Sequence, residues 1–317
     1  MKYRKRVGRK TFLWTPFDPG RDNYYSKVLS SSEQQQKEYY YSLGLNLFPA
    51  TDDRPFVEHY LQFGKVELDP KLPVEFTHRN GQKWRGVIPR GDFPYVAILV
   101  ESAALSLLFI ALPLLLFARP SVKRRGFLGV LSYFACLGFA FIAVEICLIK
   151  RYVLFLGNPA YSITTVLISL LMGAGLGSIA MGKLAKKDSR KLMGFAIPIL
   201  AAALLCEAFL SPLALNAVLG STFYTRLAVA VALLLPLGFA MGTPFPLGLS
   251  FIREWQIGEE EKKKLVAWAW GMNGYATVVG SASAVFIALF WGFKMLLFSS
   301  IAIYLISLFA IRTVKRA

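Results

Sequence analysis

The sequence predicts an all-α membrane protein, with about seven transmembrane helices after a small α+β soluble segment at the N-terminus. The chain is 55% hydrophobic and has a mean hydropathy of +0.48. From Phe93 onward its apolar residues are gathered into runs of about twenty, the length that crosses the core of a bilayer. These runs are continuous rather than alternating, so they favour helices over a membrane β-barrel.

The positive charges of the chain are distributed in relation to these apolar runs. A formal net charge of +17 would suggest nucleic-acid binding in a soluble protein. After residue 118, however, 16 of the 20 Lys and Arg residues lie in four short clusters between or after the apolar runs. The clusters are Arg119–Arg125, Lys183–Lys191, Arg253–Lys264 and Arg312–Arg316. We expect these clusters on the cytoplasmic side of a bacterial cytoplasmic membrane, and we expect no nucleic-acid partner.

Residues 1–92 form a polar zone of mixed charge, whereas residues 93–317 form the predicted transmembrane bundle. The N-terminal zone is too short and too interrupted to hold a complete enzyme core. Within it, Thr51–Pro55 is typical of a helix start, because capping side chains, acidic residues and an early proline coincide there. Asp52 and Asp53 are therefore interpreted as capping residues with Arg54 as a local partner, rather than as a metal site or an acid–base pair.

The membrane half divides into seven apolar runs. The fifth run contains three prolines and is expected to be a kinked or interrupted helix. The link Arg253–Lys264 contains the motif EEEKKK and is expected to be a solvated surface helix. The runs lie near residues 94–118, 127–149, 160–182, 192–215, 226–251, 267–290 and 293–311.

Four stretches of the chain, in order, resemble one family of large bacterial membrane proteins. They are ATDDRPF at Ala50–Phe56, VEICLIKRYVLFLGNPAYSITTVLISLLMGAGLGS at Val144–Ser178, MGTPFPLGL at Met241–Leu249 and AWAWGMNGYATVVGS at Ala267–Ser281. The family is the spermidine synthase-like proteins, in which a methyltransferase-like Rossmann domain is fused to transmembrane helices. In this resemblance ATDDRPF is the junction between the two parts, and residues 1–92 resemble the tail of the Rossmann-type domain.

The chain departs from that family in its catalytic part. Aminopropyltransferases hold their nucleotide with a glycine-rich loop after a strand, and acidic residues hold the substrate amine. The only glycine-rich run, GAGLGS at Gly173–Ser178, lies inside an apolar helix. The resemblance therefore implies a non-catalytic membrane module, without a cofactor, that anchors or partners a Rossmann-type domain. That partner would be an S-adenosylmethionine-dependent or aminopropyltransferase-like domain, and a polyamine-like or lipid-soluble molecule would be its substrate.

Intramembrane carboxylates are the strongest candidates for a functional site. Glu145 lies deep in the second apolar run and shares a helix face with Tyr152, seven residues later. Glu207 lies in the fourth run and could form one polar site with these two residues. Each carboxylate could equally serve a structural role, bonded across helices or paired with a basic residue. Catalytic residues and metal ligands are not expected, because the histidines are isolated and no Cys-x-x-Cys pair occurs.

Small residues mark the expected helix contacts. Gly173, Gly177 and Gly182 in the third run have spacings that let another helix approach closely. Gly274 and Ser281 belong to a similar stripe of small residues in the sixth run. Packing is favoured over a hinge for these glycines.

A transporter-like module is the alternative function. The basic loop Gly182–Lys191 loosely resembles the cytoplasmic loop between two spans of major-facilitator transporters. Intramembrane carboxylates and an interrupted helix also suit a protein that moves a small solute across the membrane. Seven spans without an internal repeat argue against a complete transporter. A purely structural anchor is a third possibility.

Overall fold

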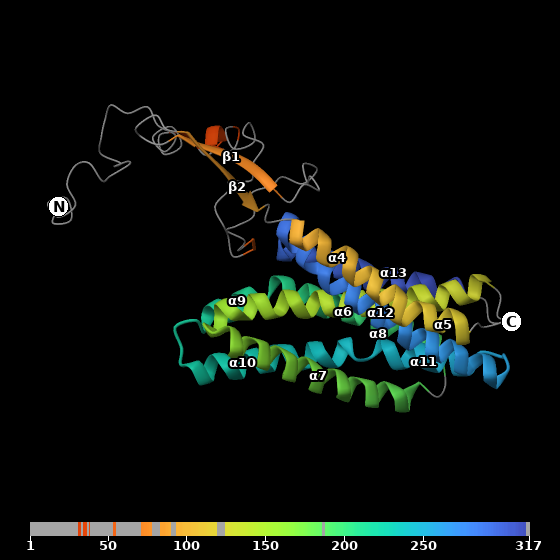
Figure 1. Cartoon of the computed structure of the whole chain (residues 1–317). Coiled ribbons are helices and arrows are strands. Elements are labelled where there is room, and N and C mark those ends of the chain that lie inside the picture. Colours follow the sequence, from red (N-terminus) through yellow and green to blue (C-terminus); the bar gives the residue numbers. More distant parts are fainter. Residues whose placement is uncertain are drawn as a thin grey trace. The chain divides into compact units, whose positions relative to one another are not determined.

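The computed structural model describes residues 31–32, 34–36, 38, 53–54, 71–77, 83–89, 93–118, 124–185 and 188–314 (Figure 1). The chain divides into two compact units. One comprises Met1–Pro49 and Glu58–Val66, and the other comprises Ala50–Val57 and Glu67–Ala317. The bundle, and the junction segment before it, therefore belong to one unit. Asp52 lies outside the described residues.

A two-stranded hairpin precedes the helices within the second unit. Strand β1 (Lys71–Thr77) pairs antiparallel with β2 (Lys83–Pro89), so that Lys71 lies opposite Pro89 and Thr77 opposite Lys83. The α+β character expected for residues 1–92 stays a prediction, because most of that zone lies outside the described residues.

Seven helical segments of the described chain are long and apolar enough to cross a membrane, as the sequence predicts. The first combines α4 (Phe93–Ser106), the π-helical turn η1 (Leu107–Ala111) and α5 (Leu112–Phe117). The fifth combines α10 (Phe223–Met241) and α11 (Pro244–Glu254). The others are α6 (Arg124–Leu156), α7 (Pro159–Leu184), α8 (Ser189–Phe209), α12 (Glu259–Trp291) and α13 (Phe293–Arg312), and a short helix α9 (Ser211–Ala217) follows α8.

Local chemistry sets the ends of these helices. Asn158 caps α7 by accepting a hydrogen bond from the Ala160 amide at 2.8 Å, and Pro159 occupies the first turn, where no amide donor is needed. The fifth span is interrupted at Gly242 and Thr243, because Pro244 cannot continue the hydrogen-bond ladder of α10. The interruption expected from its prolines is thus present.

The expectation for Arg253–Lys264 is wrong in part. The acidic and basic run Glu259–Lys264 is not a separate surface helix but forms the first turns of α12. Its carboxylates favour the positive N-terminal end of that helix, and each pairs with a lysine three residues later. The chain therefore turns between α11 and α12 within four residues, 255–258.

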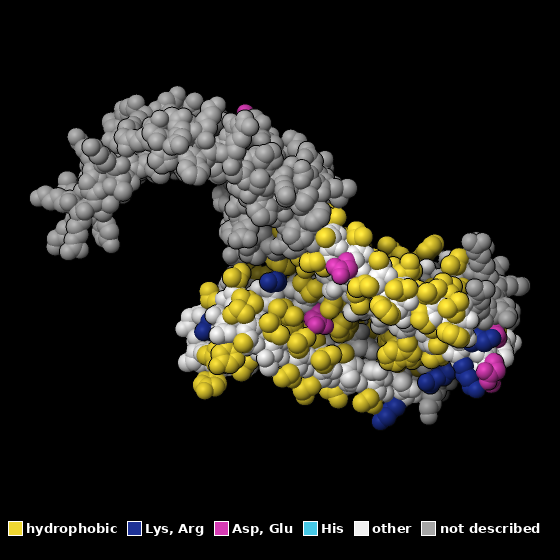
Figure 2. Space-filling model, in the orientation of Figure 1, with side chains coloured by type: hydrophobic (Ala, Val, Ile, Leu, Met, Phe, Trp, Pro, Cys, Tyr) yellow, Lys and Arg dark blue, Asp and Glu magenta, His cyan; other side chains and the backbone are white. Residues whose placement is uncertain are grey.

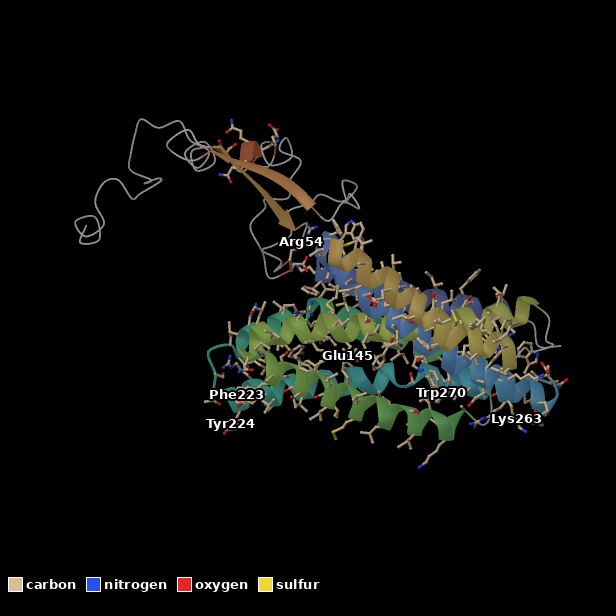
Figure 3. All side chains as sticks on the ribbon, viewed as in Figure 1. Arg54, Glu145, Phe223, Tyr224, Lys263 and Trp270 are labelled. Atoms are coloured by element: carbon tan, nitrogen blue, oxygen red, sulfur yellow. The ribbon has the colours of Figure 1, made fainter. Side chains whose placement is uncertain are left out.

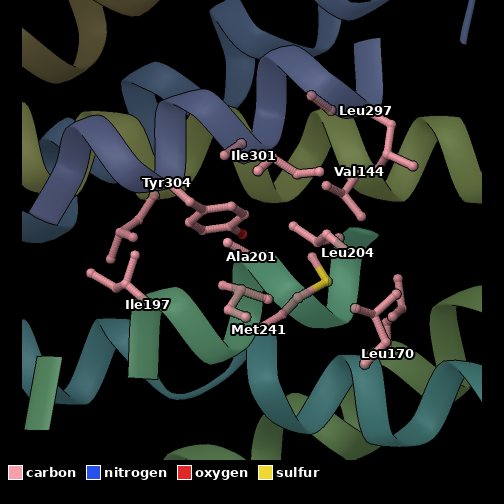
Figure 4. Packing of buried hydrophobic residues seen from close by; sticks show 14 of the residues in the cluster. Val144, Leu170, Ile197, Ala201, Leu204, Met241, Leu297, Ile301 and Tyr304 are labelled. Carbon is pink, nitrogen blue, oxygen red and sulfur yellow. The ribbon is translucent and has the colours of Figure 1, made fainter. Parts of the chain in front are cut away.

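Helix α6 lies at the centre of the bundle. It packs against α12, α13 and α7, and more briefly against α10 and α11. Figure 4 shows the resulting core, in which Val144 of α6 faces residues of α13 and Leu204 of α8. The outward faces of the helices are apolar, and charged side chains gather at the end where α11 turns into α12 (Figure 2). We call this the basic end, and we call the opposite end, at residues 157–158, 218–222 and 292, the Asp53 end.

Helices α7 and α10 approach each other closely at their glycines. A Cβ atom added at Gly173 or Gly177 would overlap the backbone of α10 at Leu235 or Phe239, and Gly238 is similarly close to the backbone of α7. Gly182 does not lie at this contact, and open space surrounds it. The reason is helical rotation, since a position five residues beyond Gly177 is turned by roughly 140°.

Two of the small residues expected to form a helix contact on α12 also lie away from that contact. Gly280 packs on Phe139 and Ile142 of α6, whereas open space surrounds Gly274. The Ser281 hydroxyl is directed back to its own helix, where it donates to the Val278 carbonyl at 2.8 Å. Gly274 and Ser281 thus lie beside the packed face rather than on it.

Candidate functional site

An ion pair between Arg151 of α6 and Glu207 of α8 lies within the apolar bundle. The Arg151 guanidinium donates to the Glu207 main-chain carbonyl at 2.8 Å and to the Ser211 hydroxyl at 3.0 Å, and it lies 3.5 Å from the Glu207 carboxylate. The Glu207 side chain is 4% exposed and that of Arg151 is 17% exposed. Removing either partner would leave a charge in a poorly solvated place.

The end of α8 explains this arrangement. Pro212 follows closely and supplies no amide donor, and the last carbonyls of a helix lack partners within it. The Ser211 hydroxyl donates to the Glu207 carbonyl at 2.6 Å, and Arg151 contributes the second hydrogen bond to the same oxygen. A cation at the negative end of the helix is also favourable. Arg151 therefore stabilises both the helix terminus and the carboxylate.

Tyr152 lies beside this pair. Its side chain is buried, and it lies within electrostatic range of both Glu207 and Arg151. The structure thus brings together two of the three residues proposed from the sequence, Glu207 and Tyr152, and adds Arg151 to them.

Glu145 is not part of this cluster. It is half-buried, lies midway along α6 (Figure 3), and forms no hydrogen bond or ion pair with any described residue. The separation follows from helix geometry, because Tyr152 is two turns further along α6, a rise of roughly 10 Å. Glu207 is near the end of α8, so it lies level with Arg151 and not with Glu145.

The two residues of the ion pair line two pockets. The lateral pocket, of about 600 Å³, is mainly apolar and is lined by residues of α8, α9 and α10, with Glu207 and Ser211 among them. The end pocket, of about 330 Å³, is lined by Arg151, Lys294 and Asp53 together with apolar residues of α6 and α9. Arg151 and Glu207 thus line different pockets.

Asp53 ties the junction segment to the bundle. Its carbonyl accepts a hydrogen bond from the Phe293 amide at 3.1 Å, and its carboxylate accepts one from the Lys294 amide at 2.8 Å. These are the first amides of α13, which the preceding residue, Gly292, cannot cap with a side chain. Asp53 therefore caps the start of α13, a helix that begins 241 residues further along the chain.

Sequence reasoning missed the partners of these residues. Arg151 is a basic residue outside the four clusters, and the sequence suggested it as a partner of Glu145 rather than of Glu207. Lys294 also lies outside the four clusters, but no role was assigned to it from the sequence. No sequence signal links Asp53 to the start of α13, since the contact exists only after the bundle has assembled.

Comparison of the chain with protein-family models, with curated proteins and with solved structures found no match. The class of protein is nevertheless defined by the structure. Seven apolar helices in one bundle make the chain a multi-pass membrane protein whose surroundings are a lipid bilayer. The resemblance to spermidine synthase-like proteins rests on the sequence segments quoted above.

Proposed function

We propose that the chain is the non-catalytic membrane module of a spermidine synthase-like protein and that it anchors or partners a Rossmann-type domain. The observation that supports this proposal is the capping of α13 by Asp53. The resemblance identifies Ala50–Phe56 as the junction between soluble and membrane parts, and Asp53 of this segment is hydrogen-bonded to the first turn of α13. A junction fixed to the bundle suits a module that holds a preceding domain at one end.

The partner proposed is an S-adenosylmethionine-dependent or aminopropyltransferase-like domain. The membrane proposed is the bacterial cytoplasmic membrane, with the four basic clusters inside. Asp53 lies at the end opposite those clusters, because it contacts the turn between α12 and α13. This topology predicts that the anchored domain lies outside the cytoplasm.

Co-purification tests the anchoring function. A Rossmann-type domain encoded next to this chain in the genome, in frame or in a neighbouring gene, is expressed with the full chain and extracted in mild detergent. We expect the domain to co-purify with the chain, and we expect Asp53→Ala to lower the recovered fraction several-fold. Failure of such a domain to co-purify, or the absence of any such gene beside the chain, contradicts the proposal.

A transporter-like module is the second candidate, and the two pockets favour it. A passage for a solute would join the lateral and end pockets if the Arg151–Glu207 pair opened. The end pocket is lined by two cations and one carboxylate, so it suits an anionic or zwitterionic solute better than a polyamine.

Uptake into proteoliposomes separates this candidate from the first. Radiolabelled glutamate is a suitable probe, because it carries both charges that the end pocket could bind. If the chain is a transporter, proteoliposomes that contain it should take up more glutamate than empty liposomes. Glu207→Gln should lower this uptake at least about tenfold. Gly258→Ala, at an exposed position at the basic end, is the control and should leave uptake unchanged. Equal uptake in Glu207→Gln and the intact chain would exclude a gating role for the pair.

A further inference from the structure

A third pocket lies at the break in the fifth span. This central pocket, of about 420 Å³, is lined by residues of α6, α7, α12 and α13 and by Met241, Gly242 and Phe245 from the two sides of the break. Gly138 and Asn273, which also line it, each lie 14 residues into a helix of 33 residues. The pocket is therefore near the middle of the bilayer. Interrupted helices at this depth are where membrane proteins commonly place a ligand.

Two polar side chains in the pocket can form further hydrogen bonds, one as a donor and one as an acceptor. Tyr304 is 1% exposed, and its hydroxyl forms no hydrogen bond with any described residue. Figure 4 shows its ring reaching from α13 into the core towards Ala201 and Met241. The Asn273 amide nitrogen donates to the Phe134 carbonyl at 3.2 Å, which leaves the amide oxygen as an acceptor. A hydroxyl that belongs to a pocket-lining residue and has no partner in the described protein can donate to an oxygen atom of a ligand.

The position of Asn273 is fixed by its surroundings. A Cβ atom at Gly138 would overlap its backbone carbonyl, so that α6 and α12 are in close contact here. Thr277 donates to the same carbonyl at 2.9 Å. The hydrogen bond from the Asn273 amide to the Phe134 carbonyl also orients its side chain before any ligand arrives, which lowers the entropy lost on binding.

Aromatic rings form one wall of the pocket. Phe134 contacts Phe245 at 5.1 Å between ring centroids, and Phe245 contacts Trp270 at 4.6 Å. Trp270 is 59% exposed, and Leu171 and Gly175, on the opposite wall, are also exposed. Figure 3 shows Trp270 further from the Asp53 end than Glu145. Since these exposed residues lie at the depth of the bilayer core, the pocket opens sideways towards lipid rather than towards water.

We propose that the central pocket binds a neutral, lipid-soluble ring compound that carries carbonyl or hydroxyl oxygens and enters from the bilayer. Aromatic walls favour a flat ring, and the Tyr304 hydroxyl and the Asn273 amide oxygen recognise oxygen substituents. None of the described residues that line the pocket carries a charge, so a charged ligand would remain unpaired there. This site is separate from the Asp53 end and does not depend on the anchoring function.

Binding of menadione, a naphthoquinone with two carbonyl oxygens, tests the proposal. The full chain is reconstituted in lipid nanodiscs, and tritiated menadione is displaced by unlabelled menadione to isolate saturable binding from partition into lipid. We expect saturable binding to the intact chain. Tyr304→Phe should weaken it by roughly fivefold to tenfold, because one buried hydrogen bond is lost while the ring remains. Dimethylnaphthalene, a ring without oxygens, should compete at least about tenfold more weakly.

A matched pair of glycine substitutions removes the ambiguity of misfolding. Gly175 lines the pocket and Gly182 does not, yet both lie on α7 and open space surrounds each. Gly175→Phe should fill the pocket and lower the affinity at least about tenfold, whereas Gly182→Phe should leave it unchanged. The proposal is overturned by the absence of saturable binding, by equal affinity in Gly175→Phe, or by equal competition from dimethylnaphthalene.

Discussion

The Arg151 guanidinium donates a hydrogen bond of 2.8 Å to the main-chain carbonyl of Glu207 and lies 3.5 Å from the carboxylate of the same residue. One side chain thus binds both a carbonyl at the end of α8 and a buried carboxylate. Loss of the arginine should therefore cost more than the loss of an ordinary surface ion pair, which contributes about 0–1 kcal/mol.

Arg151→Met should lower the free energy of unfolding by about 3–5 kcal/mol, because it leaves the Glu207 carboxylate buried and unpaired. Adding Glu207→Gln should recover part of this loss, since the double variant has no uncompensated charge. Denaturation in mixed micelles measures both variants. If the double variant is as unstable as the sum of the two single variants, the residues are not coupled.

The contact between α7 and α10 should tolerate no side chain at its closest point. Gly177→Ala should lower stability by about 1–3 kcal/mol, because the new methyl group overlaps the Phe239 carbonyl. Gly182→Ala adds the same methyl group to the same helix in open space and serves as the control. Thermal unfolding in detergent compares the two. If Gly177→Ala and Gly182→Ala melt at the same temperature, the added methyl group at residue 177 does not destabilise the packing of α7 on α10.

Gly292 should be irreplaceable for two reasons. Its φ of 89° and ψ of 169° belong to a region that only glycine adopts easily, and a Cβ atom there would overlap the Asp53 carboxylate. Gly292→Ala should therefore destabilise the chain by roughly 1–3 kcal/mol. Gly258→Ala is the matched control, because Gly258 also precedes a long helix but has a φ of −58° and open space around it. A loss of stability in both variants would point to helix capping rather than to strain.

Cysteine labelling should decide the orientation of the bundle. Gly220 lies at the Asp53 end and Gly258 at the basic end, and both are exposed with room for a side chain. After replacement of the three native cysteines, Gly220→Cys should react with a membrane-impermeant maleimide added to intact cells. Gly258→Cys should react only after the cells are opened. The reverse pattern would mean that the positive-inside argument fails here.

The number of spans and their approximate limits could be predicted from the sequence, because each span must bury about twenty apolar residues in lipid regardless of its neighbours. The interruption of the fifth span was equally predictable, since Pro244 prevents a continuous helix whatever surrounds it. The close approach of α7 follows from Gly173 and Gly177, although their partner helix could not be named. These are consequences of local chemistry.

The tertiary structure alone decided which side chains meet. Glu145 and Glu207 are both intramembrane carboxylates, but only Glu207 lies level with Arg151, because helix lengths and offsets set the depth of each residue. Asp53 resembles a local cap in the sequence, and only the folded bundle brings the first amides of α13 within hydrogen-bonding distance of it. Tyr304 carries no signal in the sequence, and it lines the central pocket only because α13 packs against α6 and α12, which also line it.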